Sequence, residues 1–279
     1  MKQLFLVFTF FYLISIHTNA QYYYKDIVSK NYGMQEIDGF KAKKIKNILI
    51  HSFNADGTES KGFYCEKKLL KNCTQIETYT KSSGGDKALL TAYYNTLGYL
   101  LQTTDSSETF SSTSLYEYDA EKRLKKITTF AHSADEDFNT TLNEVHEYVY
   151  GNSSTPIKMY KSKSGKDTLE IEFIIDANGN ITDEIEKAVN GKHYYYYYNA
   201  TNRLTDIVKY HVVYKKLLPD FTFEYDEDGQ LMQMVTVDEG VSRNFFTWKY
   251  TYNEGLRIIE KCFGSDSKLL GYFEYEYEY

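Results

Sequence analysis

The chain has 279 residues, a formal net charge of −7, 29 tyrosines and only two prolines. This balance argues against nucleic-acid binding, because phosphate recognition needs a concentrated basic surface. The sequence contains no Pro/Gly/Ser-rich linker, which favours one continuous structure over two separate domains.

Residues 1–20 have the pattern of a secretory signal peptide. One lysine precedes an apolar run from Leu4 to Ile16, and small residues occupy the positions that a signal peptidase reads. The run is shorter than the roughly 20 residues that a membrane-spanning helix needs. We therefore expect export, with residues 21–279 forming a single repeat-built β domain without a transmembrane helix. The expected location is the periplasm, the cell surface or the extracellular space, with the outer membrane as the alternative.

Two of the three cysteines lie close together after the signal peptide. In an exported chain Cys65 and Cys73 are candidates for a disulfide, and a loop that short would add about 2–3 kcal/mol of stability. The alternative is two free thiols. Residues 66–72 between them form a brief helical candidate. Cys262 is expected to be a small buried apolar residue.

A short pattern recurs along the chain in the form aromatic-x-aromatic-Asp/Asn-x-x-Gly-x-Leu. Consecutive Asp/Asn positions at 176, 199, 226 and 253 are 23, 27 and 27 residues apart, a spacing that indicates a repeat architecture. The clear copies lie at 93–100, 116–124, 173–181, 196–204 and 223–231, with looser copies at 52–59, 147–157 and 250–257.

Each copy predicts a β-hairpin. Aromatic residues at alternate positions favour a strand, the Asp or Asn side chain accepts a bond from a backbone N–H two residues on, and the Gly takes a left-handed conformation. Asn202 tolerates that conformation, whereas Lys122 would cost about 1–2 kcal/mol, so a different turn is expected at 119–122. The predicted turn residues are Asn54, Gly57, Asn95, Gly98, Asp119, Asp176, Gly179, Asn199, Asp226, Gly229, Asn253 and Gly255.

About eight hairpins give an all-β antiparallel meander of about 16 strands, joined in chain order. Strand twist accumulates across a sheet that wide, so a strongly curved sheet or a wide barrel is expected. In the five-tyrosine stretch 194–198, side chains alternate between faces, which places Tyr195 and Tyr197 opposite Tyr194, Tyr196 and Tyr198.

The repeat unit resembles the YD repeat of Rhs-type bacterial surface and toxin proteins. The match is best at 116–124, 196–204 and 223–231. This resemblance implies β-sheets wound into a hollow shell. The chain also resembles short exported bacterial proteins of unknown function with a porin-like fold, which implies a wide barrel and no known activity.

No motif for catalysis or metal binding stands out. The sequence has no Gly-x-Ser-x-Gly stretch, and no two histidines have the spacing of a zinc-binding pair. We expect no enzyme, with a hydrolase as the residual alternative, and no cofactor or metal.

The leading expectation is an exported, non-enzymatic binding or scaffolding protein. Tyrosine is enriched in interfaces, so Tyr195 and Tyr197 are the candidate binding residues, with carbohydrate or a cell-envelope protein as the partner. One alternative is an outer-membrane β-barrel. Another is an interaction protein that offers the terminal strand 272–279 as a free edge, provided that the sheet is open.

Overall fold

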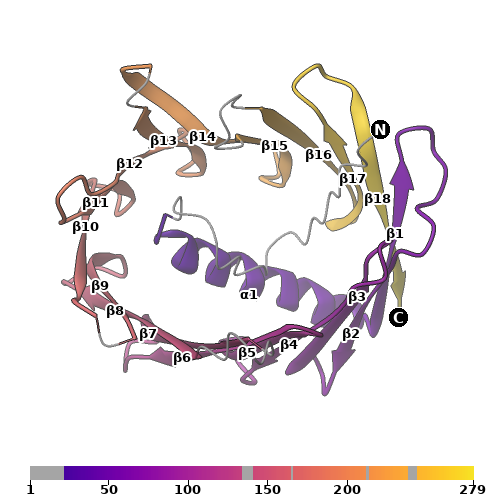
Figure 1. The fold of residues 1–279 in the computed structure, drawn as a ribbon, viewed down its shortest axis with the longest axis horizontal. Helices are drawn as coiled ribbons and strands as arrows, with labels where there is room; N and C mark the ends of the chain where they lie inside the picture. Colours follow the sequence, from indigo (N-terminus) through magenta and orange to yellow (C-terminus); the bar gives the residue numbers. More distant parts are fainter. Residues whose placement is uncertain (1–21, 134–140, 165, 212–213, 238–243) are drawn as a thin grey trace.

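The structure is a computed structural model that describes residues 22–133, 141–164, 166–211, 214–237 and 244–279. The predicted signal peptide, residues 1–20, and its cleavage site before Gln21 lie outside these ranges. The described residues form one helix and eighteen strands (Figure 1). These are α1 (Lys25–Lys43), β1 (Asn47–Asn54), β2 (Tyr64–Leu70), β3 (Gln75–Lys81), β4 (Lys87–Tyr94), β5 (Leu100–Ser107), β6 (Phe110–Tyr118), β7 (Leu124–Ser133), β8 (Thr141–Tyr150), β9 (Pro156–Lys163), β10 (Leu169–Ile175), β11 (Ile181–Glu186), β12 (His193–Tyr198), β13 (Leu204–His211), β14 (Lys216–Tyr225), β15 (Leu231–Val237), β16 (Phe245–Asn253), β17 (Leu256–Phe263) and β18 (Leu269–Glu278).

The strands form one closed antiparallel barrel. Each strand pairs with the next in the chain, and β1 pairs with β18 over its whole length, from Asn47 opposite Glu278 to Asn54 opposite Gly271. The predicted antiparallel meander is confirmed, and the sheet closes. The count exceeds the expected 16 by two strands that belong to no copy of the motif: β18, which follows the turn 264–268, and β3, which follows the β2–β3 turn. The residues of the β2–β3 turn, Lys71, Asn72 and Cys73, all have left-handed φ angles, and the helical candidate 66–72 largely belongs to β2 instead.

Because the chain direction alternates, every turn that follows an even-numbered strand lies at the same end of the barrel. We call this the repeat-turn end, since most of the predicted turns occur there. The copy at Asn54–Gly57 differs, because it follows β1 and so lies at the opposite end. Its glycine has the predicted geometry: Gly57 has a φ of 82°, and its N–H donates to the Asn54 carbonyl at 3.0 Å. The Asn54 side chain differs from the prediction, because its Nδ2 donates to Thr58 Oγ1 at 3.0 Å.

The repeat turns have the predicted chemistry. In the five-tyrosine copy, Asn199 Oδ1 accepts hydrogen bonds from the N–H groups of Thr201 and Arg203, each at 3.0 Å. Asn202 fills the Gly slot with a φ of 58°. The strand register shifts by one residue between Tyr197 and Tyr198, as expected for a type I turn followed by a bulge.

The different turn expected at 119–122 is wrong. Lys122 is left-handed, with a φ of 64°, and its N–H donates to the Asp119 carbonyl at 3.0 Å, as in the other turns. Asp119 offsets the strain on the lysine, because its carboxylate accepts from the Arg123 N–H at 2.8 Å and from Arg123 Nε at 2.7 Å.

Helix α1 lies inside the barrel and crosses the lumen (Figure 1). Sequence reasoning missed it: two glycines, Gly33 and Gly39, weaken the helical pattern, and Tyr24 at its start makes no side-chain cap. Its 19 residues span about 28 Å, enough to reach from one wall toward the other. None of the described helices is long and apolar enough to cross a membrane.

The two ends of α1 pack in separate apolar clusters on the barrel wall. Tyr23, just before the helix, packs with inward residues of β7–β13 such as Met159 and Tyr194. Ile37 and Phe40, near its end, pack with inward residues of β1–β5. The lumen therefore holds the apolar core of the protein.

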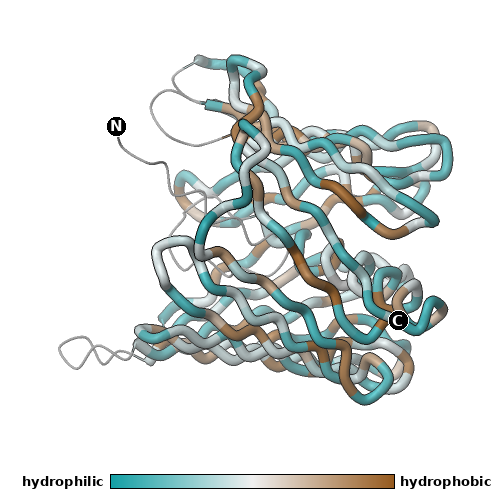
Figure 2. The backbone as a smooth tube through the Cα atoms, turned by 90° about the vertical axis from the view of Figure 1, so that its right-hand side faces the viewer, coloured by the Kyte–Doolittle hydropathy of each residue, from teal (hydrophilic) through white to brown (hydrophobic). Residues whose placement is uncertain are grey.

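The outer face of the wall carries charged side chains within its strands. Lys126 on β7 pairs with Glu147 on β8 at 3.6 Å, and Lys158 on β9 pairs with Glu170 on β10 at 2.7 Å. Hydrophilic and hydrophobic residues alternate along the strands in Figure 2, as expected when one face is dry and the other wet.

Candidate binding site in the barrel lumen

The two tyrosines predicted as binding residues lie on the outer face of β12. Tyr197 is 48% exposed, and the Tyr195 ring stacks on His193 at 4.0 Å between centroids. Tyr194 and Tyr196 point inward instead and are almost fully buried. Neither Tyr195 nor Tyr197 lines the cavity inside the barrel.

The predicted disulfide between Cys65 and Cys73 is absent, since both are free buried thiols. Cys65 points into the lumen near the start of β2, whereas Cys73 lies in the turn after Leu70. Five residues of extended strand separate Cys65 from Leu70, a distance of about 17 Å. A disulfide needs Cα atoms within about 7 Å.

The closed sheet also removes the free edge that the edge-strand alternative requires. The terminal strand β18 pairs with β17 on one side and with β1 on the other. Both of its edges are therefore occupied by the chain itself.

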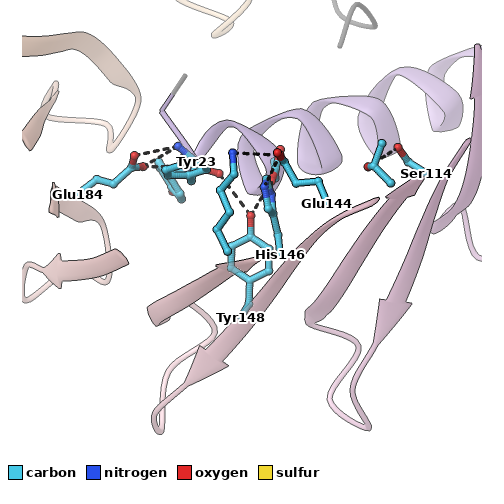
Figure 3. Close-up of polar contacts among 10 residues, drawn as sticks. Tyr23, Ser114, Glu144, His146, Tyr148 and Glu184 are labelled. Atoms are coloured by element: carbon cyan, nitrogen blue, oxygen red, sulfur yellow. Dashed lines mark hydrogen bonds and ion pairs between the residues drawn. The ribbon is translucent and has the colours of Figure 1, made fainter. Parts of the chain in front are cut away.

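A buried carboxylate on β11 holds the start of α1. Glu184 is 1% exposed and accepts from the Tyr23 N–H with both oxygens at 2.9 Å, from the Tyr24 N–H at 2.8 Å and from the Tyr196 hydroxyl at 2.8 Å (Figure 3). Burial raises the pKa of Glu184 to about 7, although these donors act in the opposite direction. A carboxylate here satisfies N–H groups that a helix start otherwise leaves without partners.

A second polar cluster joins the first turn of α1 to β8 and β9 (Figure 3). Asp26 Oδ2 contacts His146 Nδ1 at 2.9 Å and accepts from the Tyr148 hydroxyl at 2.7 Å. Glu144 binds His146 Nε2 at 3.0 Å and Lys161 Nζ at 3.1 Å.

The charges of this cluster compensate one another. Burial opposes ionisation of Glu144, but His146 and Lys161 outweigh it and lower the pKa of Glu144 to about 2. Burial also works against the His146 cation, but Asp26 and Glu144 raise the pKa of this histidine. None of these side chains lines the cavity described next. We therefore assign the cluster to anchoring α1, which holds one side of the lumen and leaves the other open.

The open side of the lumen is a cavity of about 1610 Å³ between α1 and the wall formed by β13–β18 and β1–β5. One stretch of this wall, the aromatic arc, presents Phe223, Tyr225, Trp248, Tyr252, Phe273 and Tyr275. The adjoining stretch, the hydroxyl arc, presents Ser52, Thr78, Thr80, Ser82, Asp105 and Ser107. A large concave space with apolar surface and a few polar groups is the usual form of a small-molecule site.

One corner of the cavity holds an ion pair whose carboxylate is buried and whose guanidinium is partly exposed. Arg257 Nη1 lies 3.2 Å from Glu260 Oε2, and the Tyr275 hydroxyl donates to the same oxygen at 2.8 Å. The guanidinium sits 4.5 Å from the centroid of the Tyr250 ring. Burial acts against the Arg257 cation, but Glu260 outweighs it and raises the pKa of this arginine.

Other chemistry is not apparent in the described parts of the chain. Within them, no group of three or more His, Cys, Asp or Glu side chains is arranged to hold a metal ion. Sequence reasoning did not single out Glu184, His146, Arg257 or Glu260. Their roles depend on an inward orientation and on partners up to 161 residues away, which no local motif records.

Comparisons with known proteins show likeness in structure only. No family model matches the chain, and no curated protein matches it. A porin-like protein from Bacteroides uniformis is 11% identical with a TM-score of 0.44, over 84% of this chain and 96% of that one. A TcdB2–TccC3–Cdc42 structure is 14% identical over 80% of this chain and 14% of that one, with a TM-score of 0.31. A Tc holotoxin pore from Photorhabdus luminescens is 12% identical over 77% and 16%, with a TM-score of 0.29.

Proposed function

We propose that this chain is an exported, non-enzymatic binding protein that takes its ligand inside the barrel, between α1 and the two arcs. The observation that carries the proposal is the cavity of about 1610 Å³, which α1 and the clusters around it leave open. Pockets of several hundred Å³ or more bury most of the surface of a small ligand. The anchors on Glu184 and His146 hold the helix to one side and so keep this space free.

The single tryptophan gives a direct readout of lumen binding. Trp248 lies on the aromatic arc and is 0% exposed. We would titrate the purified protein with the apolar dye 1-anilinonaphthalene-8-sulfonate and follow both dye emission and tryptophan emission. Saturable energy transfer from Trp248 to the dye is the expected result, because a dye in the cavity would lie close to the buried indole, and energy transfer needs no contact. Dye binding without any change at Trp248 would contradict a lumen site.

A matched pair of variants separates the lumen from the outer surface. Thr78→Phe adds a ring to the cavity from the hydroxyl arc, whereas Thr128→Phe makes the same change on the outer face of β7. The first variant should change the affinity for the dye or the energy transfer from Trp248, and the second should change neither. No difference between the two variants in affinity or in transfer would contradict a dye site beside the hydroxyl arc.

The second candidate is an outer-membrane β-barrel, which the closed antiparallel wall favours. The outward ion pairs Lys126–Glu147 and Lys158–Glu170 speak against it, since a lysine that faces lipid is unfavourable, by about 2–4 kcal/mol at the bilayer midplane and by less toward the interfaces. Fractionation of a Gram-negative host that expresses the chain with residues 1–20 decides between them. Our proposal expects a monomer that stays in solution without detergent. Recovery in outer membranes with heat-modifiable gel mobility would support the membrane barrel.

A further inference from the structure

The corner around Arg257 arises from a departure in the repeat. In two regular copies the arginine precedes the leucine of the motif: Arg123 lies over the Tyr150 ring at the repeat-turn end, and Arg203 lies over the ring of Tyr225. In the copy at 250–257 the order is reversed, so that Arg257 follows Leu256. The arginine of this copy lines the cavity, and its place in the motif differs from that of Arg123 and Arg203.

The reversed order places the arginine in the lumen. The turn has only two central residues, Glu254 and Gly255, both left-handed, and the strand register then shifts between Thr251 and Tyr252. Arg257 and Glu260 consequently face the same side, inward, three residues apart. A turn of two residues with positive φ angles is a type I′ turn, and the shift behaves as a bulge that re-aims the following side chain.

A buried ion pair is weak evidence for stability, because desolvation of the two ions offsets most of their attraction. Glu260 is 2% exposed, yet it lines the cavity together with Arg257 and Tyr275. The Nε atom of Arg257 is buried and makes no hydrogen bond. Donors and an acceptor are thus fixed side by side at the cavity surface, which is an arrangement suited to recognition.

The charged side chains on the cavity wall favour a neutral ligand. Arg257 faces Glu260, and Lys67 on β2 lies 3.8 Å from Glu36 on α1, so both of these cations already have a counter-charge. Asp105 on the hydroxyl arc lies on the same wall, and burial raises the pKa of its carboxyl, which favours the neutral form. A hydroxyl group, which both donates and accepts, can bond to a guanidinium and to a carboxylate at once.

The two arcs fit the two kinds of surface on a sugar. A pyranose ring presents apolar C–H faces, which pack on aromatic rings, and a hydroxyl edge, which bonds to Ser, Thr and Asp side chains. The aromatic arc and the hydroxyl arc adjoin each other along one cavity. We infer that the lumen takes a neutral oligosaccharide, with its hydroxyls read at Arg257, Glu260 and Tyr275. This inference rests on the lumen-binding function proposed above.

The test uses a panel of neutral and acidic glycans on the full mature protein. Cellohexaose, maltohexaose and chitohexaose represent neutral chains, and hexagalacturonate represents an acidic one. Binding is followed by Trp248 emission and by calorimetry. We expect saturable binding of at least one neutral hexasaccharide and tighter binding of it than of hexagalacturonate. Tighter binding of the acidic chain would overturn the inference.

Mild variants locate the site without exposing a lone buried charge. Tyr275→Phe keeps the ring and removes one hydroxyl, and it should weaken binding of the neutral glycan about tenfold, the equivalent of one hydrogen bond. Arg257→Lys removes the planar fork of donors and should weaken binding at least as much. Tyr197→Phe on the outer face and Arg203→Lys at a regular repeat turn are the matched controls. An affinity unchanged in both Tyr275→Phe and Arg257→Lys would overturn the assignment of this corner.

The dye experiment keeps the two claims distinguishable. If the dye enters the lumen but no neutral hexasaccharide binds, the oligosaccharide assignment is wrong and the lumen-binding function stands. If neither the dye nor any glycan changes Trp248 emission, the proposed function itself is contradicted.

Discussion

The hydroxyl of Tyr198 donates a 2.9 Å hydrogen bond to the carbonyl oxygen of Ile181, which occupies the leucine slot of the preceding repeat copy. The tyrosine that ends the first strand of a hairpin thus ties that hairpin to the one before it. The same bond joins Tyr118 to Leu100, Tyr150 to Leu124, Tyr225 to Leu204 and Tyr252 to Leu231. Phenylalanine could fill the same space but could not make this bond, which explains the preference for tyrosine in the slot.

Removing one of these bonds should lower stability measurably. Tyr198→Phe leaves the Ile181 carbonyl without its hydroxyl partner, so we expect a loss of about 1 kcal/mol in the free energy of unfolding. Urea denaturation of the purified protein measures it. Tyr197→Phe, one residue earlier and 48% exposed on the outer face, is the control and should change stability little. Equal losses of unfolding free energy in the two variants would show that the inter-repeat hydrogen bond stabilises the protein no more than an exposed tyrosine hydroxyl does.

Two effects disfavour a side chain at position 229: the left-handed backbone and the closeness of Arg203. Gly179, which has only the first of them, allows the two effects to be separated. Gly229 has a φ of 87°, and a Cβ at this position would overlap the guanidinium of Arg203. Gly179 has a φ of 86° with no atom within 4 Å of such a Cβ. Gly179→Ala should therefore cost about 1 kcal/mol from backbone strain alone. Gly229→Ala should cost slightly more, because the flexible Arg203 side chain must also move from its position over the Tyr225 ring.

The double variant identifies the source of the excess. Arg203→Ala removes the overlap, so the additional cost of Gly229→Ala should shrink toward that of Gly179→Ala in this background. Thermal and urea unfolding of the four proteins measure the coupling. A penalty for Gly229→Ala that is independent of Arg203 would refute the steric explanation.

The hairpins were predictable because their causes are local. An Asp or Asn three residues before a Gly encodes a turn within five residues, and alternating aromatics encode the strands that flank it. The turn at Lys71–Asn72–Cys73 escaped prediction because it has three left-handed residues without a glycine. Closure likewise depends on the pairing of β1 with β18, the first and last strands.

The lumen could not be predicted by the same route. Helix α1 is stabilised by partners far along the chain, above all by Glu184, which caps it from β11 in place of a local side chain. Side-chain alternation placed Tyr195 and Tyr197 together on one face, and the structure agrees, but only the packing of α1 shows that the lumen lies on the other face. The inward position of Arg257 was not predicted, because the sequence at 250–257 matches the repeat motif only loosely.

All three thiols should be free and protected in the native protein. Cys65, Cys73 and Cys262 are buried, and burial raises the pKa of each thiol, to about 12 for Cys262. Alkylation should be slow in the folded state, because the thiolate is the reactive form and the raised pKa values keep the thiols protonated. In denaturant, without any reductant, three labels should add, because all three thiols are free. Mass spectrometry counts the labels. A single label before reduction would restore the predicted Cys65–Cys73 disulfide.

The pH dependence of stability should report the anchors of α1. The folded-state pKa of Glu184, about 7, lies above its ordinary value of 4.5, so the folded state binds this proton more tightly than the unfolded chain does. Its contribution is then fully present below pH 4.5 and is lost as the pH rises through 7, by up to about 3 kcal/mol. Glu144 has the opposite sign: its pKa of about 2 gives stability that is lost as the pH falls from 4.5 through 2.

Glu184→Gln isolates the first effect. The glutamine carbonyl can still accept from the Tyr23 and Tyr24 N–H groups, but it does not titrate, so the decline in unfolding free energy between pH 4.5 and 7 should flatten. His146 retains a decline above its ordinary pKa, because its folded-state pKa is also raised. Urea denaturation at several pH values measures the slope, with Glu172→Gln on the outer face as the control. If Glu184→Gln and Glu172→Gln share the wild-type slope, the buried carboxylate does not titrate in this range, and the start of α1 is held by a charge that persists below pH 4.5.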